Sequence, residues 1–211
     1  MKKLLLGAAL LSICSVSSAI VWAEVGDAPE LLPGQATGPP VGTLTAITGS
    51  ILDNFDGDLF AITINDFENF SASTDNAVGT LNDTQLFLFD AAGIGVTHSD
   101  DTAEGAPGNF RSLLTAQFLT HNGLYYIGIS AYDLDPQNLG LYIWEDEPFN
   151  VERAPDGPGA PGPLGNWFFS SFGTGTYQID LTGTNTVPEP ASLLALGAGL
   201  AALAARRRRK A

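Results

Sequence analysis

The seven residues TQLFLFD (Thr84–Asp90) decide the fold class, because apolar side chains occupy both faces of an extended chain here. Successive side chains of a β-strand point to opposite faces of its sheet. A strand that is apolar on both faces must therefore be covered on both. The stretch predicts a strand in the middle of a sheet.

Three further stretches alternate so that one face is apolar: DLFAITI (Asp58–Ile64), LYYIGIS (Leu124–Ser130) and TYQIDLTG (Thr176–Gly183). GTLTAIT, ENFSAST, RSLLTAQF and GLYIWE are weaker strand candidates, and Gly, Asn, Asp and Pro fill the gaps. No stretch between residues 41 and 183 has the period of a helix. About eight short strands predict an all-β domain over residues 41–183, an antiparallel β-sandwich or jelly roll.

Two segments are too rich in proline and glycine for regular structure. Residues 24–40, EVGDAPELLPGQATGPP, predict a linker or an arm laid over the edge of the domain. Residues 145–167, EDEPFNVERAPDGPGAPGPLGNW, form a long loop. A loop of this length is either functional or loosely ordered, and its composition favours loose order.

Residues 1–23 have the organisation of a secretory signal peptide: Lys2 and Lys3, then the apolar run LLLGAALLSICSV, then small residues. The spacing of the small residues allows signal peptidase to cleave after Ala23, which we favour, or after Ala19. An uncleaved N-terminal anchor is the alternative. The single cysteine, Cys14, lies inside this segment, so the mature chain would have no disulfide and no thiolate metal site.

The charge of the chain is unevenly distributed. The net charge is −14, and all but one of the 23 acidic residues lie between Glu24 and Val187. Arg111 and Arg153 are the basic residues of that span, so its net charge is about −20. Such a surface repels phosphate backbones, which argues against nucleic acid as a partner. It suits an exported protein and can hold cations.

The tail, residues 184–211, has three parts in order: a Pro-Glu-Pro triplet, an uncharged run over residues 191–205, and a basic block. The triplet is Pro188, Glu189 and Pro190, and the block is Arg206, Arg207, Arg208, Arg209 and Lys210. Fifteen residues of helix rise roughly 22 Å, so the run predicts a short transmembrane helix whose polar ends enter the interface. The basic block would stay in the cytoplasm, with the acidic domain outside.

This tail, beside a signal peptide, closely resembles the PEP-CTERM sorting signal of Gram-negative, biofilm-forming bacteria. The resemblance implies processing by exosortase, a membrane protease-transpeptidase that handles such tails during export. It also implies a route, in which the protein is first anchored in the inner membrane facing the periplasm and is finally placed at the cell surface or in the extracellular matrix. A simple C-terminal anchor is the alternative.

A second resemblance covers residues 41–183. FDGDLFAITI, DTQLFLFDAAGIGVTHSDD and GLYYIGISAYD are similar to the strand and turn motifs of the bacterial pre-peptidase C-terminal domain family, in the branch often found with PEP-CTERM tails. The first motif lacks the family's second aspartate before the aromatic residue. The resemblance implies a β-sandwich that accompanies exported proteins and sometimes binds calcium or matrix polymers, without catalytic machinery.

Clustered aspartates are the candidate metal ligands, because calcium takes six to eight oxygen ligands. They are Asp53, Asp56 and Asp58 on one loop and Asp100 and Asp101 on another. If the two loops meet at one end of the sandwich, they form a calcium site. The alternative is solvated aspartates that favour tight turns, and it is stronger for Asp133 and Asp135, which also follow a strand.

Motifs of hydrolytic enzymes are missing from the sequence, which contains neither G-x-S-x-G nor H-E-x-x-H. His98 and His121 are expected to be ordinary turn residues. Tyr132, Trp144 and Trp167 can stack on a sugar but are expected to pack in the core or to anchor a loop. The prediction is a non-enzymatic structural or adhesive protein of the cell surface or extracellular matrix, in contact with extracellular polysaccharide. The alternative is a hydrolase, or an accessory module of one, acting on exopolysaccharide.

Overall fold

The computed structural model describes residues 19–76, 78–102, 110–169 and 173–187. Over these residues the chain is all-β, with two short 3-10 helices (η1, Phe67–Asn69; η2, Ala116–Phe118) and no α-helix. The predicted all-β, mainly antiparallel fold is confirmed.

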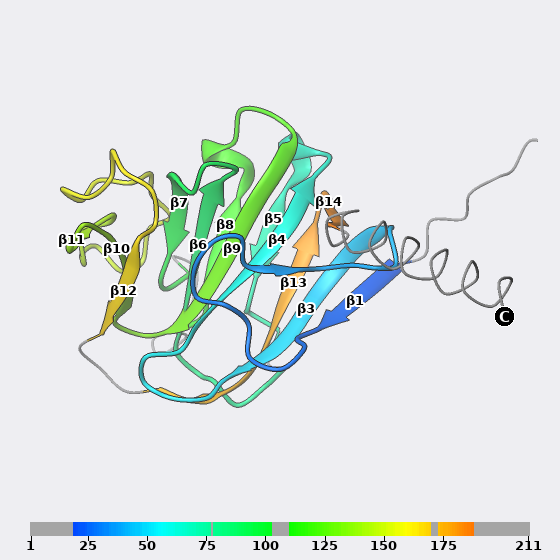
Figure 1. The fold of residues 1–211 in the computed structure, drawn as a ribbon, viewed down its shortest axis with the longest axis horizontal. Helices are drawn as coiled ribbons and strands as arrows, with labels where there is room; N and C mark the ends of the chain where they lie inside the picture. The colour runs from blue at the N-terminus through cyan, green and yellow to red at the C-terminus, as the bar shows by residue number, and fades with distance from the viewer. Residues whose placement is uncertain (1–18, 77, 103–109, 170–172, 188–211) are drawn as a thin grey trace, which may run out of the picture.

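The strands form one large and one small sheet (Figure 1). The large sheet has 11 strands in the order β7-β6-β9-β4-β14-β3-β13-β5-β8, while β1 and β2 lie off this path and pair in parallel with β3 and β4. The small sheet has the order β11-β10-β12. The bounds are β1 Ala19–Ala23, β2 Gln35–Ala36, β3 Thr43–Ile51, β4 Gly57–Ile64, β5 Ser71–Ser73, β6 Thr84–Asp90, β7 Gly95–Ser99, β8 Leu113–Thr115, β9 Gly123–Ala131, β10 Leu134–Asn138, β11 Leu141–Tyr142, β12 Asn166–Phe169, β13 Gly175–Thr182 and β14 Thr184–Thr186.

The large sheet curls until its end strands, β7 and β8, approach each other: the Leu113 backbone N–H donates to Ser99 Oγ over 3.2 Å. The architecture of the described residues is therefore a nearly closed sheet, where the sequence predicted an antiparallel β-sandwich or jelly roll. Gly183 makes the bend possible, because its φ is +72° and a Cβ there would lie 2.5 Å from the Asp66 carbonyl oxygen. Before Gly183, β13 pairs with β5, and after Gly183, β14 pairs with β4. The bend at Gly183 therefore connects two differently oriented parts of the large sheet.

The inner core fills the curled sheet. Phe60 and Ile62 of β4, Leu86 and Leu88 of β6 and Ile127 of β9 are fully buried in it. Burying each of these side chains stabilises the fold by about 1.5–3 kcal/mol. The apolar faces predicted for β4, β9 and β13 all point into this core.

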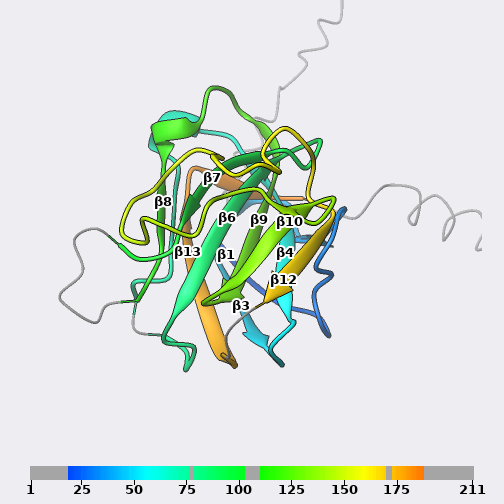
Figure 2. The ribbon, with the colours of Figure 1, turned by 90° about the vertical axis from the view of Figure 1, so that its left-hand side faces the viewer.

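A second core, the outer core, lies on the opposite face of β4, β6 and β9. Phe87 and Phe89 of β6 pack there against Trp144, with ring centroids 5.6 Å apart in each pair. The small sheet covers this face, and Figure 2 shows β10 and β12 in front of β9 and β4. β6 is therefore covered on both faces and lies between β7 and β9, as its sequence predicts.

Residues 145–167 complete this outer layer, so the prediction of loose order is wrong. Paired backbone hydrogen bonds of 3.0 Å join His98 of β7 to Arg153 in both directions. A Cβ on Gly157 would lie 2.4 Å from the Tyr142 carbonyl oxygen, so this glycine lets two backbone segments approach closely. The glycines that suggested disorder thus allow tight packing.

Residues 24–40 lie as an arm along β4, one of the two arrangements that their composition predicts. The Leu59 N–H donates to the Pro29 carbonyl over 3.1 Å, and Thr37 Oγ1 donates to the Ala61 carbonyl over 2.8 Å. These bonds bring the acidic residues of the arm to the start of β4.

Leu164→Ala is expected to lower the free energy of unfolding by about 2–5 kcal/mol, because it opens a cavity in the outer core. The matched control, Leu139→Ala, should change it by no more than about 0.5 kcal/mol, because Leu139 is 91% exposed whereas Leu164 is 6% exposed. Urea titration measures both. Equal, small effects would show that residues 145–167 do not pack on the sheet.

Candidate functional site

Three groups of carboxylates gather at one end of the large sheet, and within each group the oxygens lie within 4.8 Å of one another. The arm cluster is Glu24, Asp27 and Asp58; the turn cluster is Asp83, Asp100 and Asp101; the outer cluster is Asp133, Asp135 and Asp146. The antiparallel register explains the gathering, because the start of β4 and of β6 both lie beside the end of β9. The residues at or just beyond these strand ends therefore come close together.

The arm cluster joins the N-terminal arm to β4. The carboxylate of Glu24 accepts hydrogen bonds from the backbone N–H groups of Ala28 (2.8 Å) and Ser50 (2.9 Å), which holds the arm against β3. Asp58 is fully buried, and its Oδ2 accepts a hydrogen bond from the Tyr177 hydroxyl. Asp58 Oδ1 is buried without a hydrogen-bond partner.

The turn cluster contains two more oxygens of this kind. Asp100 is 2% exposed, and neither its Oδ1 nor that of Asp83 has a hydrogen-bond partner. A buried carboxylate without a partner is costly unless it takes up a proton or binds a cation. The turn cluster therefore contains two buried carboxylate oxygens whose cost a proton or a cation would reduce.

Burial is the main cause of the raised pKa values in these clusters. Burial, and then the negative charges of Asp101 and Asp83, raise the pKa of Asp100 to about 8. Burial also raises the pKa of Asp58 to about 8, although the hydrogen bond from Tyr177 opposes the rise. The pKa of Asp135 rises to about 7, through burial and then the charge of Asp133. A bound cation would reverse these shifts by favouring the charged forms.

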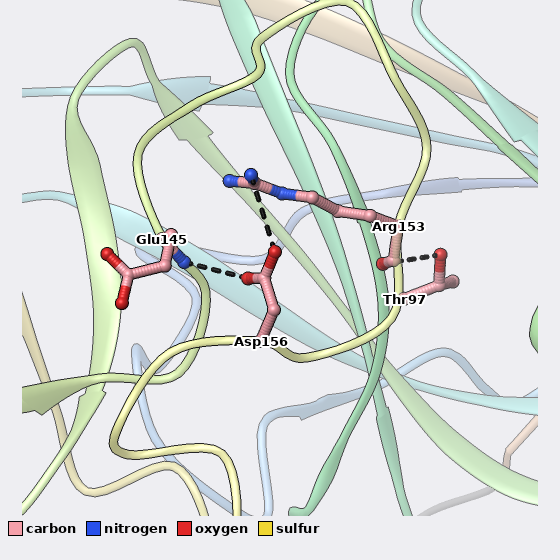
Figure 3. Close-up of polar contacts among 4 residues, drawn as sticks. All are labelled: Thr97, Glu145, Arg153 and Asp156. Carbon is pink, nitrogen blue, oxygen red and sulfur yellow. Dashed lines mark hydrogen bonds and ion pairs between the residues drawn. The ribbon is translucent and has the colours of Figure 1, made fainter.

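The two arginines of the described chain form no ion pair with these clusters. Arg153 pairs with Asp156 at 3.6 Å, and the other Asp156 oxygen accepts the Glu145 backbone N–H over 2.9 Å (Figure 3). Arg111 donates to the Leu81 carbonyl, and its charge only partly offsets the rise in the pKa of Asp83 to about 6, which burial and the Asp101 charge cause. Among the described residues, the carboxylates of the three clusters therefore form no ion pair with an arginine.

The five predicted calcium ligands do not form one site. Asp58 belongs to the arm cluster and Asp100 and Asp101 to the turn cluster, so the two loops contribute to separate groups. Asp53 and Asp56 stand outside both: Asp53 Oδ1 accepts the Phe55 N–H over 2.8 Å and Asp56 Oδ2 accepts the Leu52 N–H, as turn aspartates do. The calcium prediction thus combined cluster members with turn residues.

Sequence reasoning missed Glu24, Asp27, Asp83 and Asp146 as cluster members. Glu24 and Asp27 lie in the segment interpreted as a linker or arm, far from β4 in sequence. Asp83 could have been recognised as a cluster member, because it directly precedes the central strand β6. In the observed register it lies opposite the residues that follow β7. Pairing of strands, which the sequence does not specify, was the missing information.

The remaining candidates are packing residues. Trp144 is buried in the outer core, and Trp167 packs against the same core while its Nε1 donates to the Glu30 carbonyl over 2.7 Å, so core packing rather than an open sugar platform is confirmed for both. His98 is not a turn residue: it is buried in β7 and stacks on Phe87 at 4.5 Å. Burial, and then the charge of Arg153, lower the pKa of His98 to about 3, which keeps it neutral.

A cavity of about 550 Å³ opens where β7 and β8 approach each other. Its wall combines apolar surface with polar side chains, which include Asp101, Thr102, Gln117, Asn150 and Glu152. Such a wall offers hydrogen-bond donors and acceptors of the kind that sugar hydroxyls need.

The tail residues lie outside the described part of the chain. They are the triplet Pro188, Glu189 and Pro190, the predicted transmembrane helix over residues 191–205, and the basic block Arg206, Arg207, Arg208, Arg209 and Lys210. In the part that the structure describes, no helix has the length and hydropathy that a membrane span requires.

Comparison with known proteins identifies this tail. A family model described as the PEP-CTERM protein-sorting motif matches residues 186–209. No curated protein and no solved structure matches the chain. The match indicates an exported protein with a membrane-anchored C-terminal tail that an exosortase-type system sorts. The resemblance of residues 41–183 to pre-peptidase C-terminal domains is not supported.

In the metal-free protein, raising the pH from about 5 to about 8 is expected to lower the free energy of unfolding. The folded-state pKa values of Asp58 and Asp100 are about 8 against an ordinary value of 3.8, so over this range the folded chain retains protons that the unfolded chain has released. Their contribution is complete below about pH 4 and is lost as the pH rises through about 8. Urea titrations in the presence of a chelator measure the trend.

The Asp100→Asn variant should show a weaker pH dependence, because an amide does not titrate. Stability that stays constant or rises between pH 5 and pH 8 would contradict the assignment of protons to these buried carboxylates.

Proposed function

We propose that this protein is a non-enzymatic structural or adhesive domain of the cell surface or extracellular matrix, delivered through its PEP-CTERM tail and stabilised by calcium. The observation that carries the calcium part is the set of three buried carboxylate oxygens without partners, on Asp58, Asp83 and Asp100. The sorting motif supports delivery outside the cell.

Calcium fits the donor set better than a transition metal. The clusters consist of carboxylates alone, and hard oxygen ligands suit calcium or magnesium, whereas zinc prefers nitrogen and sulfur. Magnesium requires near-ideal octahedral geometry and gives up its waters reluctantly, while calcium accepts irregular sets of oxygens. Residues Asp83, Asp100 and Asp101 would hold one ion, and Glu24, Asp27 and Asp58 another.

A bound ion would connect parts of the chain that are distant in sequence. In the turn cluster it would join the residue before β6 to the residues after β7, and in the arm cluster it would join the arm to β4. The chain has no disulfide available for this purpose, since its single cysteine precedes residue 19. Calcium would therefore stabilise the end of the sheet at which the negatively charged carboxylates repel one another.

Millimolar Ca²⁺ is expected to raise the melting temperature, because a ligand that binds only the folded form stabilises it. At a concentration about 100-fold above Kd the shift should be about 5–10 °C. Asp100→Asn should remove most of the shift at the turn cluster. The matched control, Asp66→Asn, should keep it, because Asp66 lies in an exposed turn outside the clusters. Equal melting curves with calcium, with magnesium and with chelator would remove calcium from the proposal.

The cavity between β7 and β8 supports contact with an extracellular polysaccharide. The polar side chains of its wall suit hydroxyl groups, and its acidic members, Asp75, Asp101 and Glu152, disfavour polyanionic ligands unless calcium bridges them. The carboxylate of Glu152 is already held by the backbone N–H (2.9 Å) and the hydroxyl (2.6 Å) of Thr115, which fixes the wall in place. A fixed polar wall favours binding without reorganisation.

On a panel of neutral exopolysaccharides, the protein is expected to be retained without releasing reducing ends. Asn150→Ala should weaken retention several-fold, because Asn150 lines the cavity, whereas the control Asn65→Ala, on an exposed turn, should not. Binding and product release are measured on the same polymers. Sustained hydrolysis would overturn the non-enzymatic proposal in favour of a hydrolase acting on exopolysaccharide.

A further inference from the structure

β1 (Ala19–Ala23) is an edge strand of the folded sheet, although its residues are the last five of the segment predicted to be the signal peptide. It pairs in parallel with β3, with Ala19 opposite Thr43 and Ala23 opposite Thr48. Side-chain hydroxyls of β3 reinforce the pairing: Thr45 Oγ1 donates to the Ile20 carbonyl over 3.1 Å. β3 bonds to β13 and β14 on its other side, so β1 covers an edge that would otherwise be exposed.

The side chains of β1 alternate as those of a strand with one buried face do. Ile20 is buried in the inner core and Trp22 packs against it, whereas Ala19, Val21 and Ala23 are exposed. This period-two pattern matches the sheet on which it lies. Removal of β1 would therefore take two side chains, Ile20 and Trp22, away from the inner core.

Trp22 also fastens the arm that follows β1. Its Nε1 donates to Gln35 Oε1 over 3.1 Å, and the amide group of Gln35 bonds to both the N–H (2.9 Å) and the carbonyl (3.0 Å) of Val25. Loss of Trp22 would remove the hydrogen bond that its indole N–H donates to Gln35, the first residue of β2. The arm cluster depends on the same segment, because Glu24 directly follows β1.

We propose that signal peptidase cleaves between Ala19 and Ile20, in place of the cleavage after Ala23 that the sequence alone favours, so that the mature protein begins at the second residue of β1. Two cleavage positions fit the small-residue rule, after Ala19 and after Ala23. Cleavage after Ala23 would remove the whole strand, uncover the edge of β3 and expose part of the inner core. Cleavage after Ala19 leaves Ile20 and Trp22 in place. Ser17 and Ala19 are also both small, whereas the position equivalent to Ser17 in the other alignment is Val21.

The test is the N-terminal sequence of the exported protein. The full chain is expressed with its own leader in a Gram-negative host, recovered from the envelope fraction and analysed by Edman degradation and peptide mass spectrometry. The mature chain is expected to begin with IVWAEVGD. This readout reports cleavage whether or not a variant folds.

Ala19→Leu and Ala23→Leu form a matched pair, because both side chains are exposed at the two ends of β1. Ala19→Leu should block cleavage at this position, since leucine is too large for the residue before the cut, and Ala23→Leu should leave the N-terminus at Ile20. A native N-terminus at Glu24, retention of the leader, or a block caused by Ala23→Leu alone would overturn the proposal.

Discussion

Compensation of the charge on buried carboxylates is the constraint on which the rest of this structure depends. The register of β4, β6, β7 and β9 brings their acidic flanking residues to one end of the sheet. The same register builds the two cores, so the repulsion cannot be relieved by sliding a strand without turning apolar side chains toward water. The apolar cores hold the carboxylates together, and protons or cations must make that arrangement tolerable. Raised pKa values and oxygens without partners are two consequences of one cause.

Much of the fold could be predicted from the sequence, because its signals are local. The period-two pattern of Asp58–Ile64 and the two apolar faces of Thr84–Asp90 depend only on residues within each strand. The single nearly closed sheet could not be predicted, since it depends on a bend at Gly183 and on which strands pair across it. The order of residues 145–167 could not be predicted for a related reason. Their glycines allow two backbone segments to approach closely only where another part of the protein lies against them. That part is formed by strands distant in sequence.

The candidate site was predictable only in part. Asp100 and Asp101 stand side by side in sequence, and Asp58 stands in an acidic loop, so both loops were visible. Their partners were not, because Glu24 and Asp27 reach β4 through the arm and Asp83 reaches Asp100 through strand pairing. Asp53 shows the opposite error: its spacing suits a metal loop, but its carboxylate is occupied by a backbone N–H of its own turn. The sequence composition identifies the acidic loops, whereas the pairing of the strands determines which of these loops lie close together.

The proposed roles of the two ends of the chain fit the same picture. The PEP-CTERM motif indicates an exported protein, and the weak calcium sites of extracellular modules are the kind proposed for the carboxylate clusters. The most direct test of the account is native mass spectrometry of the mature protein after equilibration with Ca²⁺ and exchange into a volatile buffer at neutral pH. If the proposal is correct, the folded chains will carry the mass of one or two bound calcium ions and will lose these ions on acidification. Folded chains that carry only the mass of the polypeptide would contradict it.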